Sequence, residues 1–271
     1  MGTKAQSPRF IPDAYVPQGL SAKKITRQLK ALGNKTAAAH AQRFFKTGSG
    51  QYGEGDLFLG INVPVLRKLA KEHCGIALAD TVELLQSPLH EIRLLALLIM
   101  ILQYKRGENQ TAIYRAYLTH THRINNWDLV DVTAEHIIGA HLFKRNRQPL
   151  YKLARSKSLW ERRIAIIATF YFIRRNQFED TLAIADLLMN DKEDLMHKAV
   201  GWMLREIGKR DLKTEEDFLL PRYKHMPRTM LRYAIERFPE KKRISYLKSK
   251  SMEVGGIEPP SAQASQQLLR V

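Results

Sequence analysis

The chain has 271 residues, 44% of them hydrophobic and 26% charged, which is typical of a globular protein that can bury a substantial core. It carries 44 Lys and Arg against 27 Asp and Glu, a formal net charge of +17. A single cysteine excludes an internal disulfide framework, and no apolar run suits a membrane span or a secretory signal. We therefore expect a cytoplasmic protein whose excess positive charge suits a polyanionic partner.

The predicted elements are helices from one end of the chain to the other. An irregular arm at 1–20 comes first, and a helix over about 21–47 follows, with Ser21 as its N-cap. The glycine-rich stretch "TGSGQYGEGD" then forms a loop, after which a helix starts near Val63. Strand signals are nearly absent from the chain, because no stretch alternates apolar and polar residues between turn signals.

A short helix at 79–87 comes next, followed by a long buried helix with Ser87 as its N-cap and Gly107 beyond its end. Four helix pairs complete the pattern. They are predicted at 108–120 with 127–143, 148–156 with 158–176, 178–189 with 191–209, and 214–223 with 227–237. We expect one repeat domain over 21–248, followed by a disordered tail at 249–271.

A weak internal repeat of about 35 residues underlies these pairs. The segments around five residues can be set in register: Arg93, Asp128, Arg163, Lys198 and Arg232. A helix pair of this length cannot bury its apolar face alone, so such repeats stack. The predicted fold is therefore all-α, a curved solenoid of antiparallel helix pairs in which equivalent helices lie side by side.

The positive charge is concentrated toward the two ends of this arrangement. Residues 1–50 hold nine Lys or Arg and one acid, and residues 221–250 hold ten against two. Two basic ends around a nearly neutral middle suit a polyanion that is held on both sides of a central site. General solubility also explains this charge. From charge alone, the odds that the partner is nucleic acid are therefore about even.

Equivalent positions of the repeats hold an acid, aromatic residues and cations. Positions three, four and seven residues apart share one face of a helix, and neighbouring helices lie about 10 Å apart. We therefore expect one cleft to collect Asp131, Trp127, Arg163, Trp202 and Arg205. A carboxylate beside aromatic rings stabilises a developing cation, such as the oxocarbenium-like sugar of glycosidic bond cleavage.

Plainer explanations exist for the same residues. Trp202 can be a core residue, and Asp128 or Asp131 can be a structural tie to an arginine of a neighbouring repeat. The motif GxGxxG at Gly48 follows a predicted helix and not a strand, which argues against a dinucleotide site. The histidine spacings place no two ring nitrogens on one helical face, so no metal site is expected.

Four stretches resemble the AlkD family of DNA alkylation-repair glycosylases, which are curved arrays of HEAT-like helical repeats. They are "NNWDLVD", "LWERRIAI", "HKAVGWMLRE" and "MPRTMLRYAIE", and the resemblance covers about 21–248. It implies excision of positively charged N-alkylated purines, such as 3-methyladenine and 7-methylguanine, from double-stranded DNA. It also implies no metal or cofactor and no flipping of the base into a pocket, and we expect a monomer.

The resemblance also assigns site residues. The catalytic candidates are Asp131, Trp127 and Trp202. Among the DNA-binding candidates, it implies Arg163, Arg205 and Phe44. The repeat positions add Lys198 and Arg232 as cations that suit phosphates. Phe44 stands where the family has a tyrosine, so the ring is kept and the hydroxyl is lost.

Two other functions remain open from the sequence. One is a non-catalytic DNA-binding repeat protein that recognises distorted or branched DNA, and it predicts steep salt dependence without base loss. The other is a solenoid scaffold whose groove takes an acidic peptide. A lone acid between tryptophans in a basic groove argues against the scaffold.

Overall fold

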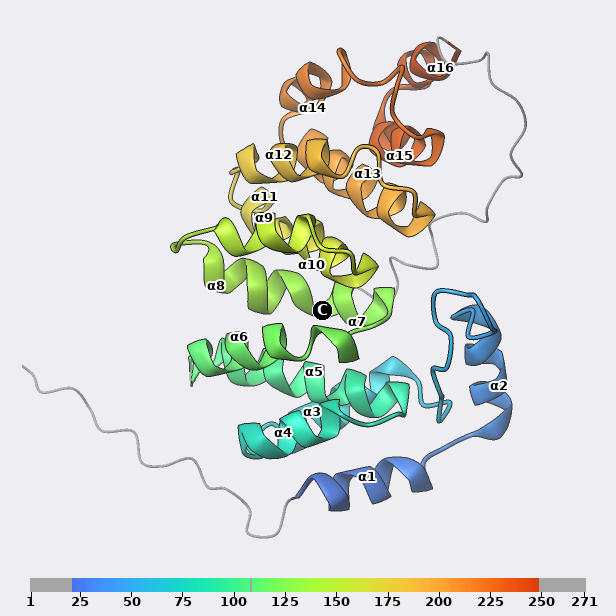
Figure 1. The fold of residues 1–271 in the computed structure, drawn as a ribbon, viewed down its shortest axis with the longest axis vertical. Helices are drawn as coiled ribbons and strands as arrows, with labels where there is room; N and C mark the ends of the chain where they lie inside the picture. The colour runs from blue at the N-terminus through green and yellow to red at the C-terminus, as the bar shows by residue number, and fades with distance from the viewer. Residues whose placement is uncertain (1–20, 108, 249–271) are drawn as a thin grey trace, which may run out of the picture.

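The computed structural model describes residues 21–107 and 109–248, so the predicted arm at 1–20 and tail at 249–271 lie outside the described residues. Within these ranges every named element is helical, and the only β pairing is an isolated bridge between Leu57 and Leu89. Figure 1 shows the helices stacked in a column, with α1 (Ala22–Ala31) at one end and α16 (Glu240–Lys248) at the other. The predicted all-α class is confirmed.

Five helices lie side by side and form what we call the central row. They are α5 (His90–Lys105), α7 (Trp127–Ala134), α10 (Leu159–Ala168), α13 (Asp194–Gly208) and α15 (Arg228–Ala234), each in contact with the next. A second layer packs against this row. It consists of α4 (Leu78–Leu85), α6 (Gln110–Thr119), α9 (Gln148–Ala154), α12 (Glu179–Leu187) and α14 (Leu212–Leu219). The chain is therefore a solenoid of helix pairs, and the five residues that align the sequence repeat all lie on the central row.

The hydrophobic core runs through the central row. Leu95, Val130, Ile164, Val200 and Leu231, one from each helix of the row, are fully buried. Burial of such a side chain stabilises the fold by about 1.5–3 kcal/mol. Stacking of the pairs therefore provides the apolar contacts that no single pair supplies.

The N-terminal helical segment differs from the single helix predicted over about 21–47. A second helix, α2 (Lys35–Phe44), follows its N-cap Asn34. The side chain of Asn34 accepts a hydrogen bond from the backbone N–H of Ala37 at 3.0 Å. The backbone N–H of Asn34 also donates to the Leu59 carbonyl at 2.7 Å. An N-cap and one tertiary hydrogen bond therefore break the helix where the apolar period alone predicts continuity.

Other helix ends agree with the predictions more closely. Ser21 caps α1 as predicted, and α3 (Val63–His73) starts where expected. The predicted N-cap at Ser87 is wrong by two residues, because Leu89 precedes the first turn of α5 and donates its N–H to the Ser87 hydroxyl at 3.1 Å. Helix α16 was not predicted.

The predicted helix at 127–143 contains a π-helical turn. Helix α7 continues into η2 (Glu135–Gly139) and then α8 (Ala140–Leu142). A Cβ on Gly139 would lie 2.1 Å from the carbonyl oxygen of Ala168, so only glycine allows this approach of the two backbones. The remaining short elements are η1 (Thr121–Arg123), α11 (Phe170–Ile173) and η3 (Ile235–Arg237). Among the described residues, no helix has the length and apolarity that a membrane crossing requires.

Candidate active site

A buried ion pair between Asp131 and Arg163 lies in the middle of the central row. On α10, Nε of Arg163 donates to Oδ1 of Asp131, and a terminal nitrogen donates to Oδ2, both at 2.8 Å. The two side chains are 4% and 5% exposed. The other terminal nitrogen of Arg163 donates to the carbonyl of Leu195 on α13. One guanidinium therefore ties α7, α10 and α13 together.

The Asp131 carboxylate lies in a buried environment, where its interactions with other charges are stronger than in water. Burial raises the pKa of Asp131 above its usual range, and the Arg163 guanidinium opposes this rise. Because both oxygens accept hydrogen bonds from Arg163, the geometry is that of the ionised carboxylate. Charges interact more strongly in a partly dry site than in water, so a cation that develops beside Asp131 would be stabilised.

Trp127 and Phe44 lie together on the N-terminal side of Asp131. Trp127 opens α7 one helical turn before Asp131 and is half-buried. Its ring stacks on Phe45 at 5.4 Å between centroids and meets Phe44 edge-on at 6.1 Å. The side chain of Phe44 is 48% exposed. The structure therefore brings Phe44 from α2 to the tryptophan beside the acid.

Two aromatic residues that the sequence did not single out join this surface. Trp160 lies one turn before Arg163 on α10, and its ring meets that of Tyr52 edge-on at 6.2 Å. Tyr52 belongs to the glycine-rich loop between α2 and α3. The repeat register contains a signal for Trp160, which is one helical turn from an aligned residue. No local pattern marks Tyr52.

Trp202 lies on α13, farther along the row. Its indole N–H donates to Glu206 at 3.2 Å, and its ring lies 5.9 Å from that of Phe170. The guanidinium of Arg174 covers the Phe170 ring at 4.5 Å. The contacts of Trp202 are thus with Glu206 and Phe170, whereas the Asp131 carboxylate is held by Arg163.

The three remaining DNA-binding candidates differ in their surroundings. Arg205 is 3% exposed and pairs with Glu236 of η3, so its contact with DNA would require this pair to open. Lys198 is half-buried and pairs with Asp194 at 2.7 Å. Arg232 lies exposed on α15. Lys198 and Arg232 are therefore better placed than Arg205 to meet a ligand at the surface.

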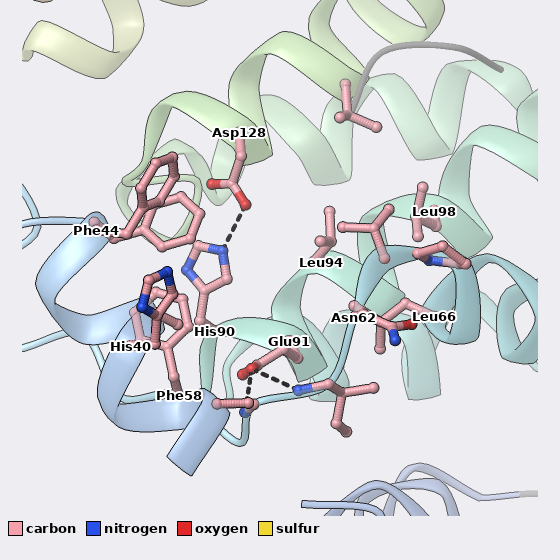
Figure 2. A pocket seen from close by; sticks show the side chains of 18 residues that line it. His40, Phe44, Phe58, Asn62, Leu66, His90, Glu91, Leu94, Leu98 and Asp128 are labelled. Carbon is pink, nitrogen blue, oxygen red and sulfur yellow. Dashed lines mark hydrogen bonds and ion pairs between the residues drawn. The ribbon is translucent and has the colours of Figure 1, made fainter. Parts of the chain in front are cut away.

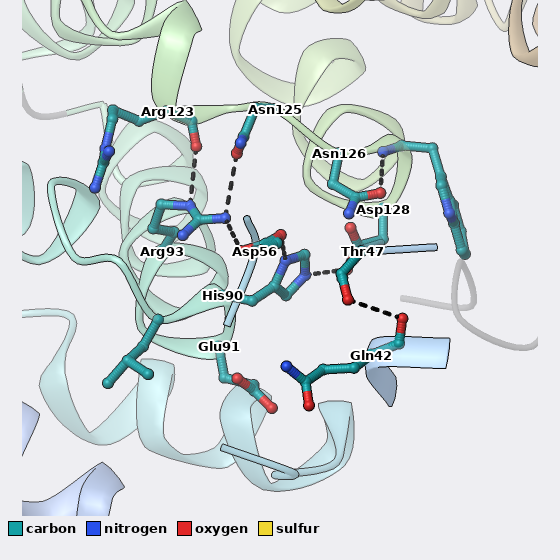
Figure 3. A network of polar contacts seen from close by, with 12 residues as sticks. Gln42, Thr47, Asp56, His90, Glu91, Arg93, Arg123, Asn125, Asn126 and Asp128 are labelled. Carbon is teal, nitrogen blue, oxygen red and sulfur yellow. Dashed lines mark hydrogen bonds and ion pairs between the residues drawn. The ribbon is translucent and has the colours of Figure 1, made fainter. Parts of the chain in front are cut away.

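A chain of buried polar side chains, which was not predicted, reaches α7 at Asp128 (Figure 3). The His90 ring bridges two carboxylates, with Nδ1 at 2.7 Å from Asp56 and Nε2 at 2.7 Å from Asp128. Arg93 donates to the other oxygen of Asp56 at 2.7 Å. Burial lowers the pKa of His90, but the Asp128 and Asp56 carboxylates outweigh it and raise the pKa to about 9. The protonated ring therefore ties the glycine-rich loop, α5 and α7 together.

A cavity of about 420 Å³ lies next to this chain of polar groups (Figure 2). Aromatic and aliphatic side chains dominate its walls, among them Phe44, Phe58 and Leu94, and Asp128 lies at its edge. Asp131 and Arg163 do not line it, so the cavity does not contain the ion pair. Within the described part of the chain, no group of three His, Cys, Asp or Glu side chains is placed to hold a metal ion.

Comparisons with known proteins agree with this architecture. Residues 25–238 match the family described as DNA alkylation repair enzyme. A solved structure of a predicted DNA alkylation repair enzyme from Enterococcus faecalis is similar, with a TM-score of 0.61, 17% identity, and coverage of 77% of this chain and 97% of that one. The crystal structure of AlkD2 from Streptococcus mutans has a TM-score of 0.47 and 18% identity, and covers 81% of this chain and 100% of that one. No curated protein matches the chain.

The fold and the row of acid, arginine and tryptophan residues define a helical-repeat protein with a buried ion pair on its central helices. The family match spans most of the chain, and its members are DNA alkylation repair enzymes. The chain belongs to this family, and the predicted resemblance to AlkD-type repair enzymes is confirmed.

Proposed function

We propose that this protein is a DNA N-glycosylase. It hydrolyses the bond between deoxyribose and a positively charged alkylated purine, such as 3-methyladenine or 7-methylguanine, in double-stranded DNA. It acts as a monomer. It needs no cofactor, because water is the only reactant besides the DNA. The observation that carries the proposal is the buried Asp131–Arg163 pair beside Trp127, in a chain of the DNA alkylation repair enzyme family.

The proposed role of Asp131 is electrostatic. As the bond from C1′ to the purine nitrogen lengthens, its electron pair leaves with the base and positive charge develops on the sugar. The Asp131 carboxylate stabilises that charge, and water then adds to C1′ and loses a proton. A cationic purine departs as a neutral base, so no side chain has to protonate it.

The neighbouring side chains would hold the DNA around this carboxylate. Trp127 and Phe44 present half-buried and exposed rings against which a deoxyribose or a cationic base can pack. Arg163 and Lys198 supply positive charge for the phosphates. Trp202 extends the aromatic surface along α13, and Arg205 contributes by holding α13 against η3.

A second candidate is a non-catalytic DNA-binding protein that recognises distorted or branched DNA. It is favoured by one observation: both oxygens of Asp131 are already engaged by Arg163, as in a purely structural ion pair. This candidate predicts strongly salt-dependent binding and no release of bases.

Release of methylated purine from alkylated duplex DNA, measured under single-turnover conditions, separates the two candidates. Asp131→Asn should slow release by about 100-fold or more, the usual effect of removing one preorganised electrostatic group. Asp191→Asn is the matched control, because Asp191 forms the same kind of ion pair with Arg162, the residue that precedes Arg163 on α10.

Each outcome has a defined meaning. Release at the wild-type rate by Asp131→Asn removes Asp131 from the mechanism. No release by the wild type, together with salt-dependent binding of duplex DNA, supports the second candidate. Slow release by Asp131→Asn and normal release by Asp191→Asn support the glycosylase.

A further inference from the structure

The cavity of about 420 Å³ has the size and enclosure of a small-molecule site. Its walls come from α2, the loop before α3, and helices α3, α5 and α7. Four residues of α2 line it, yet no residue of α2, Lys35–Phe44, is buried, so this helix covers the cavity without filling it. Pockets that hold small molecules measure roughly 300–1,000 Å³, and this cavity falls within that range.

Most of the polar groups in its walls already have partners. The Glu91 carboxylate accepts three backbone N–H groups of the loop before α3, at 2.7–3.2 Å. Both ring nitrogens of His90 contact carboxylates, and the side-chain oxygen of Asn62 caps α3. These groups therefore build the walls and leave little capacity for a ligand.

One carboxylate oxygen in the wall is free. Asp128 is 6% exposed, and its Oδ2 lies 2.7 Å from Nε2 of His90. Its Oδ1 is buried and has no hydrogen-bond partner within the described part of the chain. Figure 2 shows this carboxylate at the end of the cavity that Phe44 also lines. A buried acceptor without a partner is unfavourable, so the site suits a ligand that donates a hydrogen bond.

The walls around this oxygen are flat and aromatic. Phe44, Phe45 and Phe58 all line the cavity. The Phe58 ring stacks on His90 at 4.4 Å between centroids and on Phe45 at 5.0 Å. Such walls favour a planar ring, and the free oxygen adds the requirement for an N–H group at its edge. A purine base meets both requirements.

The cavity shares residues with the candidate active site. Phe44 forms part of its wall and also meets the Trp127 ring edge-on at 6.1 Å. Asp128 lies three residues before Asp131 on α7. A base that is released beside Asp131 therefore leaves the DNA close to the helix that carries the free oxygen.

We propose that this cavity binds the free purine base that the proposed reaction releases. An N–H group of the base donates to Oδ1 of Asp128, and the ring packs against the phenylalanines. The identity of the ligand rests on the proposed function, whereas the cavity and the free oxygen do not. The site holds the product and is separate from the electrostatic role of Asp131 in cleavage.

Calorimetric titration of the full chain with two free purines tests this site. One purine is 3-methyladenine, which has N–H donors, and the other is caffeine, a planar purine without an N–H group. The wild type should bind 3-methyladenine with a Kd below about 1 mM. Caffeine should bind about tenfold more weakly or worse, because it cannot donate to the carboxylate.

Substitutions in the cavity and beside it locate the binding. Ala37→Trp fills the cavity from α2 and should abolish binding, whereas Ala39→Trp, at an exposed position of α2 outside the cavity wall, should not. Asp128→Asn should narrow the preference for 3-methyladenine over caffeine. Asp131→Asn should leave binding unchanged, because Asp131 does not line the cavity. Ala37→Trp keeps the His90–Asp128 pair, so it remains informative if Asp128→Asn fails to fold.

Three results would overturn the site. They are the absence of saturable binding by the wild type, undiminished binding by Ala37→Trp, and equal affinity for the two purines. Equal affinity would show that Oδ1 finds its partner in water or in the amide of Asn126, whose nitrogen is also unpartnered among the described residues.

The measurement is independent of catalysis. Binding of 3-methyladenine that Ala37→Trp abolishes supports the site even if the wild type releases no base from alkylated DNA, and only the proposed function then fails. Base release without binding of 3-methyladenine overturns the site and leaves the proposed function in place.

Discussion

Nε2 of His90 on α5 lies 2.7 Å from the carboxylate of Asp128, three residues before Asp131 on α7. The same imidazole reaches Asp56 at the end of the glycine-rich loop with its other nitrogen. One buried cation therefore sets the loop and α7 relative to each other. The acid, the tryptophan and the loop tyrosine of the candidate site all depend on segments that this histidine connects.

His90 predicts a loss of stability at alkaline pH. The pKa of His90 is raised from 6.5 to about 9, because Asp128 and Asp56 outweigh the effect of burial. A raised pKa gives a stabilisation that is complete below about pH 6.5 and is lost as the pH rises through about 9. The free energy of unfolding, measured with urea from pH 6 to 10, should therefore fall more steeply in the wild type than in His90→Gln. His120→Gln, outside this network, should follow the wild type. Parallel curves for the wild type and His90→Gln would contradict the prediction.

Replacement of Arg163 by lysine should damage both stability and activity. A lysine ammonium cannot bind both oxygens of Asp131 and also the Leu195 carbonyl, so buried polar atoms lose their partners. We expect the free energy of unfolding to fall by about 3 kcal/mol and base release to slow. Arg162→Lys, in a more exposed pair, should cost about 1 kcal/mol or less. Urea titrations and single-turnover assays check this, and equal losses in the two variants would refute it.

The two basic ends should contribute to DNA affinity without regard to sequence. Figure 1 places α1 and α16 at opposite ends of the column, and Lys23, Lys24 and Lys241 lie exposed on them. Their replacement by glutamate should weaken binding to every duplex and make the plot of log affinity against log salt shallower, by about one unit per lost phosphate contact. The same change at Lys152 and Lys213 of the second layer is the control. An unchanged salt slope would show that the ends are not the footprint.

Gly201 should tolerate no side chain. On α13, a Cβ at this position would lie 2.4 Å from the carbonyl oxygen of Met230, so Gly201→Ala must push α13 and α15 apart. Overpacking of this kind costs about 1–3 kcal/mol. The melting temperature should drop in Gly201→Ala and stay unchanged in Gly75→Ala. An unaffected melting temperature in Gly201→Ala would mean that α15 adjusts freely.

Much of the candidate site was accessible from the repeat alone. The spacing of Asp128, Arg163, Lys198 and Arg232 placed each on a helix of the central row, because equivalent residues of a stacked repeat occupy equivalent positions. The alignment left open whether Asp128 or Asp131 pairs with an arginine of a neighbouring repeat, and the structure pairs Asp131 with Arg163. The sequence pattern did not reveal that Arg205 is buried against Glu236. Nothing in the local pattern around either residue distinguishes it from a solvent-exposed charged residue of a helix.

The sequence by itself determined that the chain is helical, where most helices begin and end, and which residues share the central row, because these depend on apolar period, capping residues and repeat spacing. Only the tertiary structure decided the break at Asn34, the buried His90 bridge and the place of Tyr52. Each of these depends on contacts between segments far apart in the chain. The sequence of a glycine-rich loop has no apolar period from which its conformation can be predicted. The groups that the loop packs against therefore fix where its tyrosine points.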